Sequence, residues 1–360
     1  MPIIEDPSAD DVLLRTEGRA AFLTLNRPKA INALTRGMVQ RIAAALDGWQ
    51  ADPSIESVVI TGAGERGLCA GGDIRAVRES VITGRPREAA EFWRDEYRLN
   101  LAIARYPKPY VAIMDGIVMG GGVGISAHGS VRIVTERSRV AMPETGIGFI
   151  PDVGGTYLLS RAPGELGTHL ALTGTAVGAG DAVLCGLADH FVPSAALRDF
   201  TFTAALATED ASAALKTFAA PVPDAEFAVH RTWIDECYAA DTVEEIVDRL
   251  QRHASPAANQ AAATILTKSP TALKVTLAAV RRARDLPDLQ HVLEQEFLVS
   301  CSGLAEPDLA EGIRAQVVDK DRNPHWRPAT LAEVPDTVVA RYFTPPRVGD
   351  DHAYLGRLFS

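Results

Sequence analysis

Strand and helix patterns alternate along the first half of the 360-residue chain and then give way to helices. Residues 11–26 read as two short strands around a turn at Glu17 and Gly18, because apolar, β-prone residues flank a glycine. Apolar residues then recur at helical spacing between Thr35 and Gln50, and a buried strand ended by glycines follows at residues 56–64. This order of strand, strand and helix predicts the α/β class, with helices layered on a sheet.

The same order returns further along the chain. The patterns predict an amphipathic helix at residues 87–106, a strand at 109–116, a glycine-rich helix start at 121–129 and two strands within 131–144. Beyond about residue 193 strand patterns fade and amphipathic helices follow one another. We therefore expect an α/β core over 1–193, a helical region over 194–342 that packs on the core, and a tail over 343–360.

Composition and charge exclude several classes of partner. With 47% hydrophobic and 23% charged residues the chain is that of a globular protein with a sizeable core, and its net charge of −10 disfavours nucleic acid and anionic membranes. The apolar stretch from Val111 is interrupted by Asp115 and by glycines, so we predict no membrane span. The four cysteines lack the spacing of a zinc site or a disulfide framework, and the first residues lack a signal-peptide pattern, so we expect no metal and a cytoplasmic location.

Three glycine-rich segments are candidates for ligand contact. Gly62–Gly67 satisfies G-x-G-x-x-G, but it runs on into a further loop instead of opening a helix, so a turn is the better interpretation than a dinucleotide site. Cys69–Asp73 and Met119–Gly124 each lie between a predicted strand and a predicted helix. Backbone amides at such places are free to bind a polarised carbonyl, and glycine lets the substrate approach closely, so the two loops together could form an oxyanion hole.

Two carboxylates stand in an otherwise apolar, glycine-rich and proline-rich stretch, "MPETGIGFIPDVGG" at residues 142–155. Glu144 and Asp152 are eight positions apart in it. A charge among apolar groups is costly unless it has a partner or a task, so both are candidates for acid–base chemistry.

Four segments together resemble the crotonase, or enoyl-CoA hydratase/isomerase, superfamily. They are "NRPKAINAL" (26–34), "LCAGGDI" (68–74), "MDGIVMGGGVG" (114–124) and the stretch at 142–155. The last segment, and "EPDLAEGIRAQVVDKDRNPHWRP" near the end, are most similar to the 3-hydroxyisobutyryl-CoA hydrolase subgroup. The resemblance implies a spiral of repeated β-β-α units with a C-terminal helical region, and a trimeric or hexameric homo-oligomer.

The resemblance also implies roles for backbone and basic residues. The amides of Gly72 and Gly121 would hold the thioester carbonyl of an acyl-CoA substrate. Arg27 and Lys29 would lie against the phosphates of CoA, although both are equally compatible with solvated surface charges. No cofactor is implied beyond the coenzyme A that the substrate carries.

The acids set this chain apart from the hydratases it resembles. Hydratases use two glutamates, and Gly124 stands where the first is expected, whereas Glu144 keeps the second. The resemblance implies that Glu144 and Asp152 are catalytic and that Glu96 contacts substrate. It thus implies hydrolysis of a short branched 3-hydroxyacyl-CoA, with 3-hydroxyisobutyryl-CoA of valine breakdown as the expected substrate.

Other interpretations of these residues stay open at this level. Asp152 could be an ordinary helix N-cap, and Glu96 could lie on the solvent face of an amphipathic helix. His128 and Cys69 are expected to be packed core residues. The rival functions are an enoyl-CoA hydratase or isomerase that uses Glu144 alone, and a CoA-binding scaffold without catalysis.

Overall fold

The computed structural model describes residues 11–198, 206, 210–345 and 358–359. The chain forms two compact units that are interleaved in sequence. Unit 1 comprises residues 1–72, 98–140 and 177–225, and unit 2 comprises residues 73–97, 141–176 and 226–360. This division differs from the single boundary expected at residue 193, because segments of the first half contribute to both units. Most of the expected tail, residues 346–357 and 360, lies outside the described residues.

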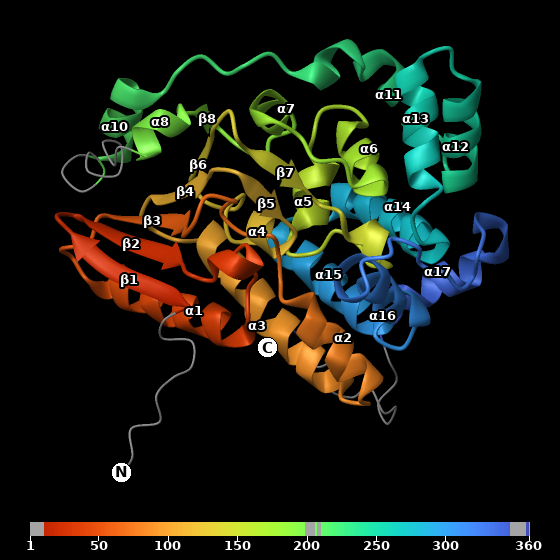
Figure 1. Ribbon diagram of the computed structural model, residues 1–360, viewed down its shortest axis with the longest axis horizontal. Helices are drawn as coiled ribbons and strands as arrows, with labels where there is room; N and C mark the ends of the chain where they lie inside the picture. Colours follow the sequence, from red (N-terminus) through yellow and green to blue (C-terminus); the bar gives the residue numbers. More distant parts are fainter. Residues whose placement is uncertain (1–10, 199–205, 207–209, 346–357, 360) are drawn as a thin grey trace. The chain divides into compact units, whose positions relative to one another are not determined.

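Unit 1 is built on a six-stranded sheet in the order β1-β2-β3-β4-β6-β8 (Figure 1). The strands are β1 (Val12–Glu17), β2 (Ala20–Leu25), β3 (Ser57–Gly62), β4 (Tyr110–Met114), β6 (Val131–Val134) and β8 (His190–Phe191). β1 and β2 form the expected antiparallel hairpin, whose turn contains Gly18 at a φ of 55°. All other neighbours pair in parallel, which requires crossover connections through other elements.

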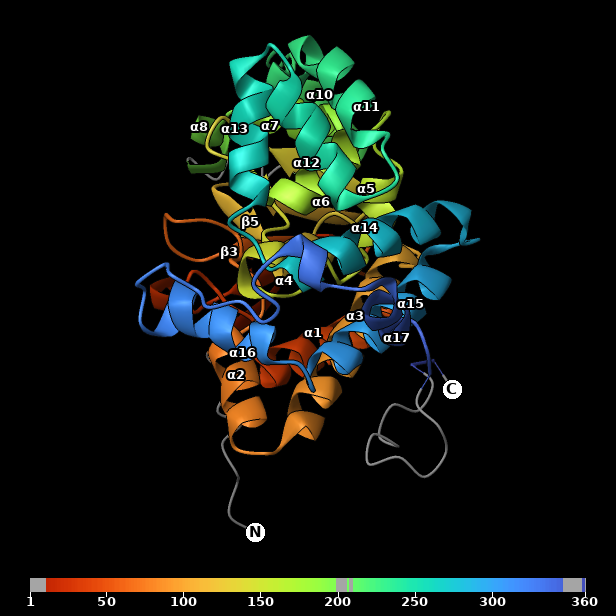
Figure 2. The same ribbon diagram turned by 90° about the vertical axis from the view of Figure 1, so that its right-hand side faces the viewer.

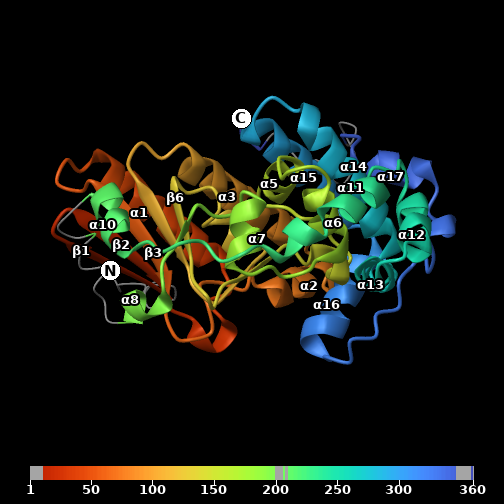
Figure 3. The same ribbon diagram turned by 90° about the horizontal axis from the view of Figure 1, so that it is seen from above.

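Helices cover the sheet of unit 1. α1 (Arg36–Ala51) begins where the Thr35 side chain accepts a hydrogen bond from the Met38 amide at 3.2 Å, and it lies against β1. On one sheet face Phe22, Val59 and Val111 form an apolar core with α10 (Ala211–Phe218), whose position over the first strands is visible in Figure 3. The remaining elements are η1 (Pro28–Ala30), α4 (Gly121–Gly124), α7 (Ala179–Leu184) and α8 (Ser194–Arg198), with β5 (Ile117–Met119) and β7 (Arg139–Ala141) as a separate two-stranded sheet.

Unit 2 is helical. Its helices are α2 (Ile74–Ile82), α5 (Gly155–Ser160), α6 (Leu166–Thr173), α11 (Arg231–Tyr238), α12 (Val243–Arg252), α13 (Pro256–Ile265), α14 (Pro270–Asp285), α15 (Leu289–Gly303), α16 (Pro307–Ile313) and α17 (Asp336–Tyr342). Short 3-10 or π turns are η2 (Glu144–Ile147), η3 (Glu226–Val229), η4 (Arg314–Val318) and η5 (Leu331–Glu333), and α3 (Pro86–Ala104) contributes residues to both units. Figure 2 shows α11, α12 and α13 side by side.

The sequence explains where the long helices of unit 2 begin. Ser269 caps α14, which has Pro270 in its first turn, and Asp288 caps α15 by accepting from the His291 amide at 3.0 Å. One apolar core of this unit joins Ile150 to α14 and α15. The predicted α/β class with a helical second part is confirmed. Within the described part of the chain no helix is both long and apolar enough to cross a membrane.

Candidate active site

Two glycine loops of unit 1 lie side by side. Cys69 pairs with Val118 in a short parallel bridge, and a Cβ on Gly71 would lie 3.6 Å from the amide nitrogen of Gly121. A Cβ on Gly122 would lie only 2.4 Å from the Cys69 carbonyl oxygen, so glycine is required there for the loops to pack. The fold thus brings together the loops that carry Gly72 and Gly121.

The backbone amides of Gly72 and Gly121 are available for a ligand. Among the described residues neither N–H group donates a hydrogen bond to the protein, and Gly121 is the first residue of α4. The neighbouring Cys69 is fully buried, and its thiol contacts the Asn32 carbonyl at 3.2 Å. That placement agrees with a packing role for Cys69, because a buried thiol in such surroundings is unreactive.

The G-x-G-x-x-G turn is a packing element of unit 1. A Cβ on Gly62 would lie 2.7 Å from Nδ2 of Asn32, and one on Gly67 would lie 2.2 Å from the Ile117 amide nitrogen. Gly64 and Gly67 have positive φ angles of 83° and 154°. Positive φ therefore explains Gly64, while Gly62 is needed for close packing, and the segment continues into bridges instead of opening a helix.

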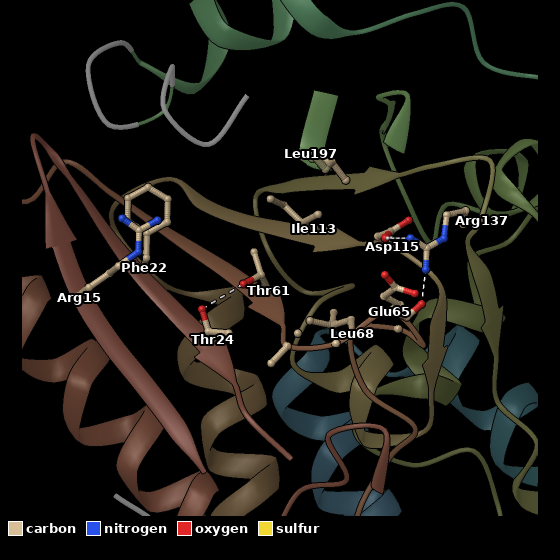
Figure 4. A pocket seen from close by; sticks show the side chains of 14 residues that line it. Arg15, Phe22, Thr24, Thr61, Glu65, Leu68, Ile113, Asp115, Arg137 and Leu197 are labelled. Atoms are coloured by element: carbon tan, nitrogen blue, oxygen red, sulfur yellow. Dashed lines mark hydrogen bonds and ion pairs between the residues drawn. The ribbon is translucent and has the colours of Figure 1, made fainter. Parts of the chain in front are cut away.

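A pocket of about 700 Å³ lies beside this turn, at the carboxyl ends of β2 and β3 (Figure 4). Two pairs of its polar side chains contact each other: the hydroxyl oxygens of Thr24 and Thr61 are 3.2 Å apart, and Arg137 lies 3.2 Å from the Asp115 carboxylate. None of the predicted site residues lines this pocket. The pocket is therefore lined by residues of unit 1 for which the sequence predicted no catalytic or binding role.

The two basic candidates have different surroundings. Arg27 is half-buried, donates to the Ala33 carbonyl at 2.6 Å and lies 3.7 Å from the Asp11 carboxylate. It therefore shapes its own turn, whatever else it binds. Lys29 lies in η1 and is exposed. Contact with CoA phosphates stays a prediction for both.

The acids lie in unit 2, where Glu144 is the first residue of η2. Its side chain is only 6% exposed, and its Oε2 atom has no hydrogen-bond partner among the described residues. Burial, followed by the nearby charge of Asp152, raises the pKa of Glu144 well above its usual value. An unpartnered carboxyl oxygen with a raised pKa is suited to take up and release a proton during a reaction.

Asp152 does not cap a helix. α5 begins at Gly155 after Gly154, and no side chain of its own N-terminal turn accepts its first amides. The Asp152 carboxylate is 6% exposed and accepts a hydrogen bond from the Tyr97 hydroxyl at 2.7 Å. Burial raises the pKa of Asp152 to about 7, and the hydrogen bond from Tyr97 opposes the rise. The N-cap interpretation of Asp152 is therefore wrong.

Glu96 lies on the buried face of α3, at 2% exposure. Its Oε1 atom has no hydrogen-bond partner among the described residues, and burial followed by the Asp152 charge raises its pKa well above the usual value. The solvent-face interpretation of Glu96 is therefore wrong. Its contact with substrate remains a prediction.

The sequence analysis missed three residues of this cluster: Tyr97, Glu296 and Ser300. Tyr97 is fully buried between Asp152 and the Ser300 hydroxyl, whose oxygen lies 2.9 Å from the phenol oxygen. Glu296 is fully buried on α15, and burial raises its pKa to about 8. The rise is opposed by three hydrogen bonds that its carboxylate accepts from Gly154 and Thr156. Only Glu296 could have been found from the sequence. It lies at helical spacing among apolar residues of α15, such as Val292, Leu293 and Phe297, where a charged residue is unusual.

Four buried carboxyl groups thus share one region of unit 2 without a cation. In the part of the chain that the structure describes, no Lys or Arg forms an ion pair with Glu96, Glu144, Asp152 or Glu296. The same residues form no group arranged to hold a metal ion. Burial raises the pKa of all four groups, and the charge of Asp152 raises the pKa of Glu96, Glu144 and Glu296 further, so the groups do not all ionise together and protons remain in the cluster near neutral pH.

Comparison with known proteins places these residues in a family context. The family model described as enoyl-CoA hydratase/isomerase matches residues 20–343. The chain is 41% identical to 3-hydroxyisobutyryl-CoA hydrolase, mitochondrial, of Gallus gallus, over 94% of this chain and 90% of that protein. It is 40% identical to the protein of the same name from Homo sapiens, over 93% and 89%.

A solved structure extends the similarity to the fold. The crystal structure of a carnitinyl-CoA dehydratase from Mycobacterium thermoresistibile is 55% identical, with a TM-score of 0.91 over 97% of this chain and all of that one. The predicted cytoplasmic location is wrong on these comparisons, since the relatives are named mitochondrial. The four cysteines are free and buried, and their spacing in the sequence does not distinguish one compartment from another. Family match and coverage together establish that the chain belongs to the enoyl-CoA hydratase/isomerase family.

Proposed function

We propose that this protein hydrolyses the thioester of a short branched 3-hydroxyacyl-CoA, with 3-hydroxyisobutyryl-CoA as the expected substrate. The observation that carries the proposal is the pair Glu144 and Asp152, two buried carboxyl groups in unequal surroundings. Asp152 is fixed by Tyr97, whereas one oxygen of Glu144 has no described partner. Two such acids can divide the duties of proton transfer and orientation.

The proposed reaction needs only water and these residues to supply and remove its protons. The amides of Gly72 and Gly121 bind the thioester oxygen, and Glu144 takes a proton from the water that attacks the carbonyl carbon. Collapse of the tetrahedral intermediate breaks the carbon–sulfur bond, and the proton on Glu144 passes to the CoA thiolate. Asp152 and Glu96 orient the 3-hydroxyl. No cofactor takes part, and activity is expected to survive treatment with EDTA.

Hydration is the rival within the family, since similar solved structures are named as a carnitinyl-CoA dehydratase and an enoyl-CoA hydratase. Hydration uses two acid–base groups, and Gly124 supplies none where the hydratases carry the first glutamate. The curated relatives named as hydrolases match over most of the chain and support the hydrolase proposal.

The test is release of free CoA, followed with a thiol reagent, from 3-hydroxyisobutyryl-CoA, with hydration of crotonyl-CoA measured in parallel. Glu144→Gln and Asp152→Asn should each abolish release while the protein stays folded by circular dichroism. Asp308→Asn is the matched control, because Asp308 is buried in the same unit but accepts from Ser269 and Arg327. Crotonyl-CoA hydration without CoA release would contradict the proposal, and CoA binding without any turnover would favour a scaffold.

Two further expectations belong to this proposal. Single turnover in ¹⁸O-labelled water tests whether Glu144 acts as base, because label would enter its carboxylate only if it were the nucleophile. The trimer or hexamer expected of the family is tested by light scattering after size-exclusion chromatography.

A further inference from the structure

Two polar side chains on one face of α15 act on Asp152 by different routes. Glu296 and Ser300 are four residues apart on this helix and both are fully buried. We propose that they are positioning residues: Glu296 fixes the backbone of the loop that carries Asp152, and Ser300 fixes the Tyr97 hydroxyl that binds its carboxylate. This inference rests on the proposed function only in taking Asp152 as a group that acts on substrate.

The Glu296 route runs through the loop between Asp152 and α5. Val153 has a φ of 53°, a left-handed conformation that is a true outlier for a β-branched residue, and Gly154 follows at 80°. This conformation is strained at Val153, though not at Gly154, and it persists only where the surroundings hold it. The loop therefore needs an anchor.

The Glu296 carboxylate supplies that anchor. Its Oε2 accepts from the Gly154 amide at 2.6 Å, and its Oε1 accepts from the Thr156 amide at 2.9 Å and from the Thr156 hydroxyl. These amides belong to the first turn of α5, which has no cap from its own segment. A side chain 140 residues away in sequence thus holds the strained turn directly after Asp152.

The Ser300 route runs through Tyr97. A phenol has one proton, and when it is donated to ionised Asp152 the Ser300 hydroxyl must be the donor in the 2.9 Å contact with the Tyr97 oxygen. Donation from Ser300 polarises the phenol and strengthens its hydrogen bond to Asp152. Ser300 therefore orients Tyr97 and favours the ionised form of Asp152.

The titratable groups around Asp152, among the described residues, affect its pKa or are affected by its charge. Glu96 and Tyr97 face it from α3, Glu144 from η2 and Glu296 from α15. The charge of Asp152 raises the pKa of all three glutamates, and burial raises the pKa of Asp152 itself, whereas the hydrogen bond from Tyr97 lowers it. Loss of the Tyr97 donor must raise the pKa of Asp152.

The Tyr97 and Ser300 variants test the second route. Tyr97→Phe should move the pH limb of kcat/KM assigned to Asp152 upward by about one unit, since a hydrogen bond to a charged group is worth roughly that much. Ser300→Ala should move the limb in the same direction by less, and should lower kcat more than it raises KM. Tyr238→Phe and Ser302→Ala are matched controls: Tyr238 is a buried phenol bonded to His169, and Ser302 is a hydroxyl on α15 bonded to the Leu298 carbonyl. Neither control should move the limb.

The Glu296 variants test the first route. Glu296→Gln places an amide donor where one oxygen now accepts, so kcat should fall by about 10²-fold, the scale of a 1 Å displacement of a catalytic group. Glu296→Asp keeps the carboxyl group but shortens its reach, and should recover only part of that loss. Glu294→Gln, on the exposed side of α15, should leave kcat unchanged. If Glu296→Gln does not fold, the Tyr97 and Ser300 variants, each compared with its matched control, decide the proposal.

The outcome that overturns the inference is a wild-type kcat and pH profile in both Tyr97→Phe and Ser300→Ala. If the wild-type protein releases no CoA, the proposed function fails, and the inference is then tested by a measurement that does not depend on activity. Carboxyl ¹³C NMR would follow the titration of Asp152 in the wild-type protein and in Ser300→Ala. An unchanged midpoint would overturn the positioning role, and a raised midpoint would support it.

Discussion

The phenol oxygen of Tyr97 lies 2.7 Å from Oδ2 of Asp152, and both side chains are buried in unit 2. This hydrogen bond favours the ionised carboxylate in surroundings that otherwise disfavour a charge. Glu144 has no comparable donor on its Oε2 atom among the described residues. The two acids therefore differ in how readily they release a proton, which is what a division of catalytic labour requires.

We expect hydrolysis to depend on pH near neutrality. The pKa of Asp152 is raised to about 7, and its proposed role needs the ionised form to accept the 3-hydroxyl. Activity should therefore be lost as pH falls through about 7. The measurement is kcat/KM from pH 5 to pH 9 in buffers of constant ionic strength, and a flat profile between pH 5 and pH 8 would contradict this assignment.

Glu144→Gln should stabilise the fold at alkaline pH while it abolishes activity. The pKa of Glu144 is raised on folding, so between its unfolded and folded values the folded protein binds the extra proton and the free energy of unfolding falls as pH rises. A neutral amide removes that loss. Thermal unfolding should show a Tm higher by about 2 °C or more at pH 8, and no difference near pH 4. Equal Tm values at both pH values would argue against the raised pKa, and Glu294→Gln, on the exposed side of α15, is the control.

Gly122→Ala should separate the two glycine loops. Its Cβ would lie 2.4 Å from the Cys69 carbonyl oxygen, so the backbone must shift and carry the Gly121 amide with it. Loss of one oxyanion donor lowers kcat by about 10²–10³-fold. Gly48→Ala is the matched control, because an added Cβ on this exposed residue of α1 meets nothing within 4 Å. That change should raise the free energy of unfolding by about 0.5–1 kcal/mol and keep kcat.

Glu96→Leu should weaken binding of the 3-hydroxyl. The buried Oε1 of Glu96 has no described partner, and its pKa is raised well above the usual value, so the protonated carboxyl can donate a hydrogen bond to the hydroxyl oxygen while Asp152 accepts the hydroxyl proton. We expect KM for 3-hydroxyisobutyryl-CoA to rise about fivefold, the scale of one neutral hydrogen bond. Isobutyryl-CoA, which lacks the hydroxyl, should show equal KM values for variant and wild type. An equal rise for both substrates would mean that Glu96 acts on something other than the hydroxyl.

Local patterns predicted the elements well where the pattern repeats over many residues. The hairpin around Gly18, the helix after Thr35 and the long helix α3 all appear where the turn glycine and the apolar periodicity place them. The residue-level alternatives failed for a different reason. Asp152 near a helix start and Glu96 on an amphipathic helix each had a plausible local interpretation, and burial in unit 2 excluded both.

Tyr97, Glu296 and Ser300 could not be assigned from sequence because their roles depend on partners far along the chain. Tyr97 meets Asp152 across 55 positions and Ser300 across 203, and no spacing rule spans such separations. A tyrosine and a serine on apolar helix faces are ordinary core residues until their hydrogen bonds are known. Glu296 alone was conspicuous, as a charge within an apolar stripe.

The sequence by itself determined the α/β class, the places of the glycine loops and the presence of two acids in an apolar stretch, since these follow from periodicity, from clustered glycines and from ordered motifs. Only the tertiary structure decided the interleaved units, the pairing of the two glycine loops and the burial of four carboxyl groups in one cluster. The physical reason is that desolvation and hydrogen bonding set the protonation of an acid, and both depend on which distant side chains the fold packs around it.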